Sequence, residues 1–150
     1  MNEIEFERRL RTSLEPTSGW AGSLHSELTG RIIGAAIAVH RELGPGKLES
    51  VYERALAIEL RACGIPFRTQ VPIPMLYRGE SVGDFFADFI VDRKVIVELK
   101  AVDALRSVHR AQVLSYLRAT ELELGLLINF NVCVLKDGVR RLIHSRVCVP

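Results

Sequence analysis

The stretch from Asp88 to Lys100, which reads DFIVDRKVIVELK, constrains the fold more than any other part of the chain. It predicts the end of one strand, a tight turn over residues 92–94, and a second strand over residues 95–102 whose β-branched composition suits burial on both faces. Two charged residues, Glu98 and Lys100, interrupt this apolar run. Because they are two residues apart on a strand, they project from the same face. Asp88, across the turn, can add a second carboxylate to that face.

A carboxylate inside an apolar strand is costly unless it is paired or binds a cation, so Glu98 needs a partner. One interpretation is structural: Lys100 forms an ion pair with Glu98 or Asp88 at the end of the strand. The other is a magnesium site, in which two carboxylates bind the hard cation and the lysine lies beside them. The spacing of these three residues is compatible with both interpretations.

The rest of the chain predicts one mixed sheet with helices packed on it. Gly44, Pro45 and Gly46 end the first of two N-terminal helices, and Pro72 and Pro74 mark the first strand as an edge strand. A helix joins the third strand to the fourth, and a crossover of this kind makes those two strands parallel. The expected order is helix, helix, three strands, helix and two strands, over residues 24–43, 48–63, 67–77, 82–91, 95–102, 107–120, 124–130 and 139–149.

Length and composition are those of an ordinary folded domain. The chain has 150 residues, 48% of them hydrophobic, and a net charge of +2, which permits a nucleic-acid partner without requiring one. Its three cysteines form no CxxC pair, so neither a disulfide framework nor a zinc or iron–sulfur site is expected. We expect a single domain over residues 24–150, preceded by a loosely attached extension over residues 1–23, in a cytoplasmic protein without a membrane span.

The order αβββαβ, with an aspartate on the second strand and Glu-x-Lys on the third, resembles the PD-(D/E)XK nuclease superfamily. Residues 46–52, GKLESVY, fit the G-x-x-E-x-x-Y signature of the bacterial GxxExxY group within it. The likeness extends over about residues 26–144, including the runs IIGAAIAVHRELGPG, ADFIVDRKVIVELKAV and LGLLINFNV. The proline of the superfamily's name is Ala87 here, at a loosely kept position. The resemblance implies a restriction-endonuclease-like α/β fold with a mixed central sheet flanked by helices.

The resemblance also implies a metal site. Glu49, Asp88 and Glu98 match the acids that bind the metal in the superfamily, and the peptide carbonyl of Leu99 is an additional candidate ligand. Oxygen ligands suit magnesium or manganese rather than zinc, so Mg²⁺ or Mn²⁺ is the expected cofactor. A carboxylate at Glu49, in the first turn of its helix, is also favoured by the helix dipole without any metal.

Three further residues match catalytic positions of the superfamily. Lys100 matches the lysine of the motif, which would hold or deprotonate the attacking water or offset charge on the phosphate. Gln112 and Tyr116 match a polar pair on the following helix, and their spacing of four residues puts them on one helix face. The implied activity is that of a metal-dependent phosphodiesterase, a hydrolase that cuts DNA or, as the second choice, RNA.

The basic residues at the start of that helix, Arg106, His109 and Arg110, fit either a phosphate-contacting surface or an ordinary solvated one. A second hypothesis for the protein is a catalytically silent nucleic-acid-binding or scaffold protein that keeps the nuclease fold. A third is a structural protein that forms a homodimer through an apolar edge strand. The complete set of two acids and a lysine favours the nuclease, with a nucleic acid and no membrane as its partner.

Overall fold

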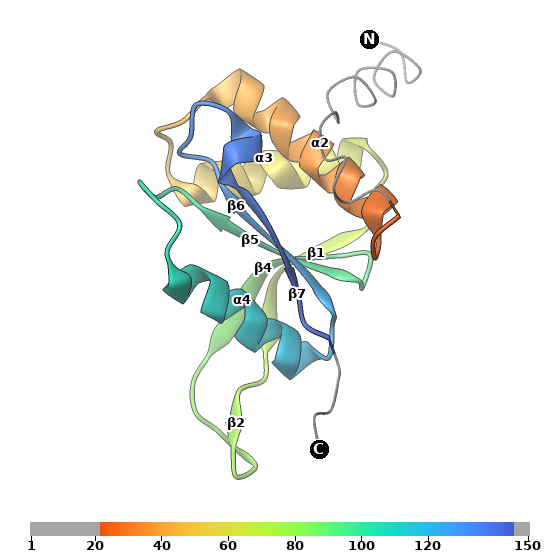
Figure 1. Ribbon diagram of the computed structural model, residues 1–150, viewed down its shortest axis with the longest axis vertical. Coiled ribbons are helices and arrows are strands. Elements are labelled where there is room, and N and C mark those ends of the chain that lie inside the picture. Colours follow the sequence, from red (N-terminus) through yellow and green to blue (C-terminus); the bar gives the residue numbers. More distant parts are fainter. Residues whose placement is uncertain (1–21, 146–150) are drawn as a thin grey trace.

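The computed structural model describes residues 22–145, so almost all of the expected N-terminal extension lies outside the described residues. The described part is a five-stranded sheet with helices on both faces (Figure 1). A two-stranded hairpin projects from it. The elements in chain order are α2 (Ser26–Leu43), α3 (Glu49–Ala62), β1 (Phe67–Ile73), β2 (Leu76–Tyr77), β3 (Glu80–Ser81), β4 (Phe85–Val91), β5 (Val95–Lys100), α4 (Ser107–Thr120), β6 (Leu124–Asn129), the 3-10 helix η1 (Leu135–Gly138) and β7 (Val139–Ile143).

The central sheet is mixed, as the sequence predicts. Its strand order is β1-β4-β5-β6-β7, with β1 and β7 at the edges. Strand β4 pairs antiparallel with β1 and β5, β6 pairs antiparallel with β7, and β5 pairs parallel with β6. Helix α4 makes the crossover between β5 and β6, which is the connection that a parallel pair requires. The expected mixed α/β sheet flanked by helices is therefore confirmed.

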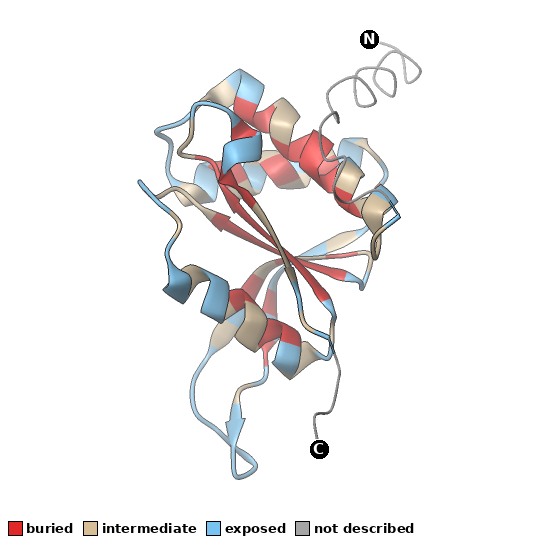
Figure 2. Cartoon of the chain, in the orientation of Figure 1, coloured by how far each residue is buried: buried red, intermediate tan, exposed pale blue. Residues whose placement is uncertain are grey.

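Each face of the sheet packs against its own helices (Figure 2). Helices α2 and α3 cover one face, where Ile32 and Leu56 are fully buried against strand residues that include Val97. Helix α4 covers the other face, where Val113 and Leu117 belong to a second, smaller cluster. The middle strands β5 and β6 are buried almost throughout, which explains their continuous apolar composition.

The connection between α2 and α3 takes the shape that its glycines allow. Gly44 and Gly46 have φ angles of 66° and 91°, in the region that favours glycine, and they end α2 where the sequence predicts. The buried Tyr52 of α3 holds this loop, because its hydroxyl donates to the Gly44 carbonyl at 2.6 Å and accepts the Lys47 N–H at 3.1 Å. The start of α3 is thus fixed against the end of α2.

The predicted strand boundaries are wrong in three places. Residues 67–77 do not form one strand: β1 ends at Ile73, and Leu76–Tyr77 pairs with Glu80–Ser81 in the separate hairpin. Pro74 supplies no N–H for a ladder, so pairing along one strand stops there. Strand β4 begins at Phe85 rather than residue 82. Strand β7 follows a 3-10 turn and ends at Ile143, and residues 146–149 of the predicted last strand lie outside the described residues.

The edge strand β1 is also less apolar than expected, since Arg68, Thr69 and Gln70 in its middle are exposed. This weakens the case for a dimer formed through an apolar edge. Among residues 22–145, no helix is both long enough and apolar enough to cross a membrane.

Candidate active site

Strands β4 and β5 separate at the position of the two motif acids. Their backbone pairing runs from Val91↔Val95 to Phe89↔Val97 and stops there. One residue further on, the Asp88 N–H donates to Glu98 Oε1 at 2.9 Å. The Leu99 N–H in turn donates to Asp88 Oδ2 at 2.8 Å. The two carboxylates therefore take the place of ladder hydrogen bonds, and each is anchored where the strands part.

Glu98 and Lys100 lie on the α4 side of β5. Val97 and Leu99 pack into the cluster under α2 and α3, whereas Ile96 belongs to the cluster under α4. By strand alternation Glu98 and Lys100 share the side of Ile96. Glu98 is 3% exposed and Lys100 is partly buried. The predicted common face of this acid and this lysine therefore follows from the packing of their neighbours.

Glu49 approaches the same group of charges from α3. It is the first residue of that helix and is partly buried. Burial raises the pKa of its carboxyl, the positive charge of Lys100 lowers it, and the negative charges of Asp88 and Glu53 raise it. Glu49 is thus close enough to β4 and β5 to be influenced by both motif strands.

Glu98 carries the strongest electrostatic perturbation of the group. The pKa of Glu98 is raised from 4.5 to about 8, most of all by burial and next by the negative charge of Asp88. The hydrogen bond from the Asp88 N–H and the positive charge of Lys100 lower the pKa of Glu98. The negative charge of Glu49 raises it by a smaller amount. With a pKa of about 8, Glu98 is largely protonated at neutral pH in the metal-free protein, because burial first and the charge of Asp88 second disfavour its ionised form.

Lys100 does not neutralise these carboxylates by direct contact. Within residues 22–145, no ion pair of 4.0 Å or less joins Lys100 to Glu98 or Asp88. The simple ion-pair interpretation of the motif is therefore wrong. The same described range contains no group of three His, Cys, Asp or Glu side chains gathered closely enough to hold a metal ion. Glu49, Asp88 and Glu98 are near neighbours whose carboxylates do not converge on one point.

The donor set nevertheless fits a hard divalent cation. Its side chains offer carboxylate oxygens, the ligands that magnesium and manganese prefer. Glu98 Oε2 accepts no hydrogen bond from the described residues and is not sealed from solvent. A bound cation would also offset the mutual repulsion that raises the pKa of Glu98.

Gln112 and Tyr116 meet on α4, as their spacing predicts. Gln112 Nε2 donates to the Tyr116 hydroxyl at 3.1 Å, and Tyr116 is 3% exposed. Burial raises the pKa of Tyr116, the Gln112 hydrogen bond lowers it, and the charges of Glu98 and Asp88 raise it. Tyr116 is therefore near enough to the motif acids to be affected by their charge, and it lies on the α4 face of the sheet, whereas Glu49 belongs to α3.

A comparison with protein-family models matches residues 26–142 to the PD-(D/E)XK nuclease superfamily. The chain belongs to the PD-(D/E)XK nuclease superfamily. The match includes the segments that carry Glu49, Asp88, Glu98, Lys100 and the α4 pair, and it names the superfamily without naming the GxxExxY group. No curated protein and no solved structure matches the chain.

The basic residues at the start of α4 divide into two roles in this PD-(D/E)XK domain. His109 Nδ1 accepts the Arg106 N–H at 2.9 Å, so this imidazole caps the helix. The side chains of Arg106 and Arg110 are exposed. The helix end that His109 caps thus presents the guanidinium groups of Arg106 and Arg110 to solvent.

Several contacts of the site could not be read from the sequence pattern. The Tyr52 hydroxyl bonds to the α2–α3 loop and not to Glu49, so its effect on that acid is indirect. The buried Asn129 holds the segment after the motif, since it accepts the Val102 N–H at 3.1 Å and donates to the Val102 carbonyl at 2.8 Å. Gln70 contacts Asp88 from β1, and a polar residue on an edge strand carries no signal of such a contact.

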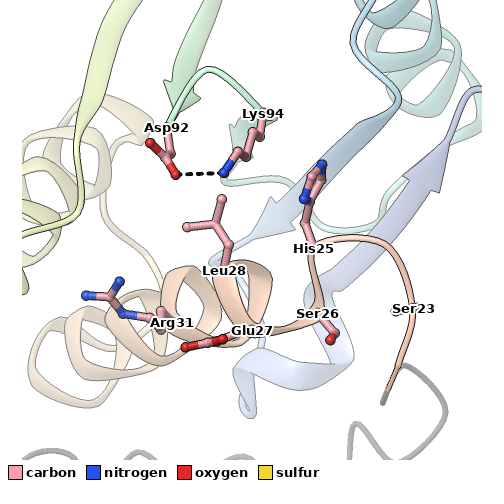
Figure 3. A pocket seen from close by; sticks show the side chains of 8 residues that line it. All are labelled: Ser23, His25, Ser26, Glu27, Leu28, Arg31, Asp92 and Lys94. Carbon is pink, nitrogen blue, oxygen red and sulfur yellow. Dashed lines mark hydrogen bonds and ion pairs between the residues drawn. The ribbon is translucent and has the colours of Figure 1, made fainter.

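A pocket of about 410 Å³ lies elsewhere, between the start of α2 and the β4–β5 turn (Figure 3). His25 and Arg31 line it from the helix side, and the ion pair of Asp92 and Lys94, at 3.3 Å, lines it from the turn. None of the candidate site residues contributes to its wall. This pocket is therefore separate from the motif.

Proposed function

We propose that this protein is a metal-dependent nuclease that hydrolyses phosphodiester bonds in DNA, with RNA as the second choice of substrate. The observation that carries the proposal is the pair of carboxylates at the parting of β4 and β5. Asp88 and Glu98 are each anchored by a backbone N–H of the neighbouring strand. The pKa of Glu98 is raised to about 8 there. A strongly perturbed acid among other charged side chains is typical of a functional site.

The proposed cofactor is Mg²⁺ or Mn²⁺. Glu49, Asp88, Glu98 and the carbonyl of Leu99 are the proposed ligands, and their oxygen chemistry supports this assignment. When bound, the cation would polarise a phosphodiester oxygen and lower the pKa of a bound water. Glu98 would have to lose its proton first, since a ligand carboxylate binds in the ionised form.

Lys100, Gln112 and Tyr116 are the remaining proposed catalytic residues. Lys100 would hold the attacking water or offset charge that develops on the phosphate oxygens, and its lack of an ion pair with the motif acids leaves its ammonium available for this. Gln112 would orient the water or the substrate together with the Tyr116 hydroxyl, to which its amide donates. Arg106 and Arg110 would contact the phosphate backbone of the substrate, with His109 fixing the helix end that carries them.

The second candidate function is a catalytically silent protein that binds nucleic acid or serves as a scaffold. The observation that favours it is that the carboxylates of residues 22–145 do not converge as a metal site. We also propose membership of the GxxExxY group, supported by Gly46, Glu49 and Tyr52, of which Tyr52 organises the loop before the signature acid. Size-exclusion chromatography tests the homodimer.

The test of the proposed function is cleavage of single- and double-stranded DNA and RNA in Mg²⁺ or Mn²⁺. Asp88→Asn and Lys100→Ala should each lower the rate about 100-fold or more, because each removes a group that stabilises the transition state. Asp92→Asn and Lys94→Ala are the matched controls, since this pair lies on the exposed turn of the same hairpin. The controls should cut like the wild type. Equal inactivity of wild type and all variants on every substrate would favour the silent protein.

A further inference from the structure

Gln70 has an unusual backbone conformation in the edge strand β1. Its φ angle is 47°, in the left-handed region that a residue with a side chain rarely adopts. Strand β1 pairs with β4 on both sides of this position, at Thr69↔Phe89 and Val71↔Ala87, in one unbroken register. No residue is inserted, so the strain belongs to Gln70 itself. The residue opposite it in this register is Asp88.

At the Gln70–Asp88 position, the inward side chains of both β1 and β4 switch from one face of the sheet to the other. Before the switch in β1, Phe67 packs with the cluster under α2 and α3, and beyond it Ile73 belongs to the cluster under α4. In β4, Phe89 belongs to the first cluster and Ala87 to the second. Residues an even number apart on a regular strand share a face, so each strand twists over between these positions. The Gln70 conformation accompanies the twist that brings Asp88 to the edge of the candidate site.

The side chain of Gln70 joins two acids of different elements. Its Nε2 donates to Glu53 Oε1 of α3 at 2.9 Å and to Asp88 Oδ1 of β4 at 3.2 Å. The other oxygen of Asp88, Oδ2, accepts the Leu99 N–H at 2.8 Å. Both oxygens of the Asp88 carboxylate are therefore held, one by β5 and one by Gln70. Glu53, which also raises the pKa of Glu49 by its charge, anchors the amide from the helix.

We propose that Gln70 is a positioning residue, which ties Asp88 to Glu53 and so sets the orientation of the Asp88 carboxylate and the affinity of the site for a divalent cation. The part that concerns the cation rests on the proposed function. An amide suits the place because it is neutral and supplies two N–H donors, one for each carboxylate. Partners of this kind, which orient the ligands of a metal, affect metal affinity without touching the metal.

A purely structural role explains these observations less well. The Gln70 side chain is exposed, so it does not fill the core. Glycine would adopt the same backbone angle without strain, so the backbone alone favours glycine over glutamine. Strained backbone held in place by its surroundings is typical of functional sites. What glutamine adds over glycine here is its pair of hydrogen bonds to Glu53 and Asp88.

The experiment compares the wild type, Gln70→Gly and Arg78→Gly by calorimetric titration with Mn²⁺ and by urea unfolding in EDTA. Arg78 is the matched control, because it is another exposed non-glycine residue with a positive φ angle, of 50°, in the projecting hairpin. We expect Gln70→Gly to unfold at the wild-type urea concentration or higher and to bind Mn²⁺ about 10-fold more weakly. Arg78→Gly should bind Mn²⁺ like the wild type. Equal Mn²⁺ affinity of Gln70→Gly and wild type would overturn the inference.

A second readout needs no metal. In ¹H–¹⁵N spectra of the metal-free wild type, the side-chain amide of Gln70 should give two resonances displaced from those of free glutamine, and Glu53→Ala should move them toward the free values. Resonances at free-glutamine values in the wild type would overturn the inference. A wild type that binds no Mn²⁺ would count against the proposed cofactor, and the amide spectra would then decide the role of Gln70 at Asp88 alone.

Discussion

Replacing Glu98 by Gln should stabilise the metal-free protein at high pH and leave its stability nearly unchanged at low pH. The pKa of Glu98 is 4.5 in an unperturbed chain and about 8 in the folded protein. Because the folded-state pKa is the higher one, folding favours the protonated acid. Its contribution to stability is complete below pH 4.5 and is lost as the pH rises through 8. Glutamine cannot ionise, and its amide oxygen can still accept the N–H of Asp88.

The size of the effect follows from the separation of the two pKa values. Each unit corresponds to about 1.4 kcal/mol, so complete ionisation of Glu98 costs the folded protein a few kcal/mol and at most about 5 kcal/mol. The excess stability of Glu98→Gln over the wild type should therefore grow from near zero at pH 5 to a few kcal/mol at pH 9.

Urea unfolding in EDTA at several pH values measures this difference directly. Glu80→Gln, in the exposed β2–β3 hairpin, is the control and should follow the wild type at every pH. A difference between Glu98→Gln and wild type that does not change from pH 5 to pH 9 would refute the reasoning, because it would mean that Glu98 ionises in the folded protein as easily as in water.

Three other predictions concern the α2–α3 loop, the packing of α4 on β6 and the proton of Glu98. Tyr52→Phe removes two hydrogen bonds of the α2–α3 loop, including the one to the Gly44 carbonyl. It should lower the free energy of unfolding by about 1–2 kcal/mol in urea titrations, and an unchanged value would contradict the role of the hydroxyl. Gly125→Ala would bring a methyl group to 2.6 Å from Val113 Cγ1 between β6 and α4. We expect the free energy of unfolding in urea to fall by about 1–3 kcal/mol, and a value equal to that of the wild type would show that α4 can move away. Mn²⁺ binding at pH 7 should release close to one proton per ion from Glu98. Calorimetry in buffers of different ionisation enthalpy measures the number of protons released, and a number of zero would contradict the raised pKa of Glu98.

The sequence pattern predicted the features that depend on local periodicity. The helices, the buried strands and the parallel crossover follow from the spacing of apolar residues and from the order of elements, and all are present. The contact between Gln112 and Tyr116 follows from helix geometry alone, since residues four apart are neighbours on one face. Glu98 was predicted to need a partner because a charged residue is rare in a buried strand, and its raised pKa reflects that burial.

Contacts between distant parts of the chain were not predictable in the same way. The bonds of Gln70 join residues separated by 17 and 18 positions, and nothing in the local sequence specifies such a meeting. The spacing of the motif left an ion pair of Lys100 and a metal site as two open alternatives, and the backbone N–H groups that bind Glu98 Oε1 and Asp88 Oδ2 have no signal in a residue pattern. Strand composition alone assigns Leu76 and Tyr77 to the end of the first strand, although they pair with Glu80 and Ser81 in a separate hairpin.

The projecting β2–β3 hairpin also divides the chain into two complementary pieces. Its tip at Gly79 is exposed and lies between the piece that carries Glu49 and Gln70 and the piece that carries Asp88, Glu98 and Lys100. Backbone connections at exposed loop tips of this kind tolerate interruption. The pieces would still meet along the antiparallel β1–β4 ladder, which has six paired positions. The domain is therefore suited to fragment complementation, in which neither half has the site and their reassembly restores it.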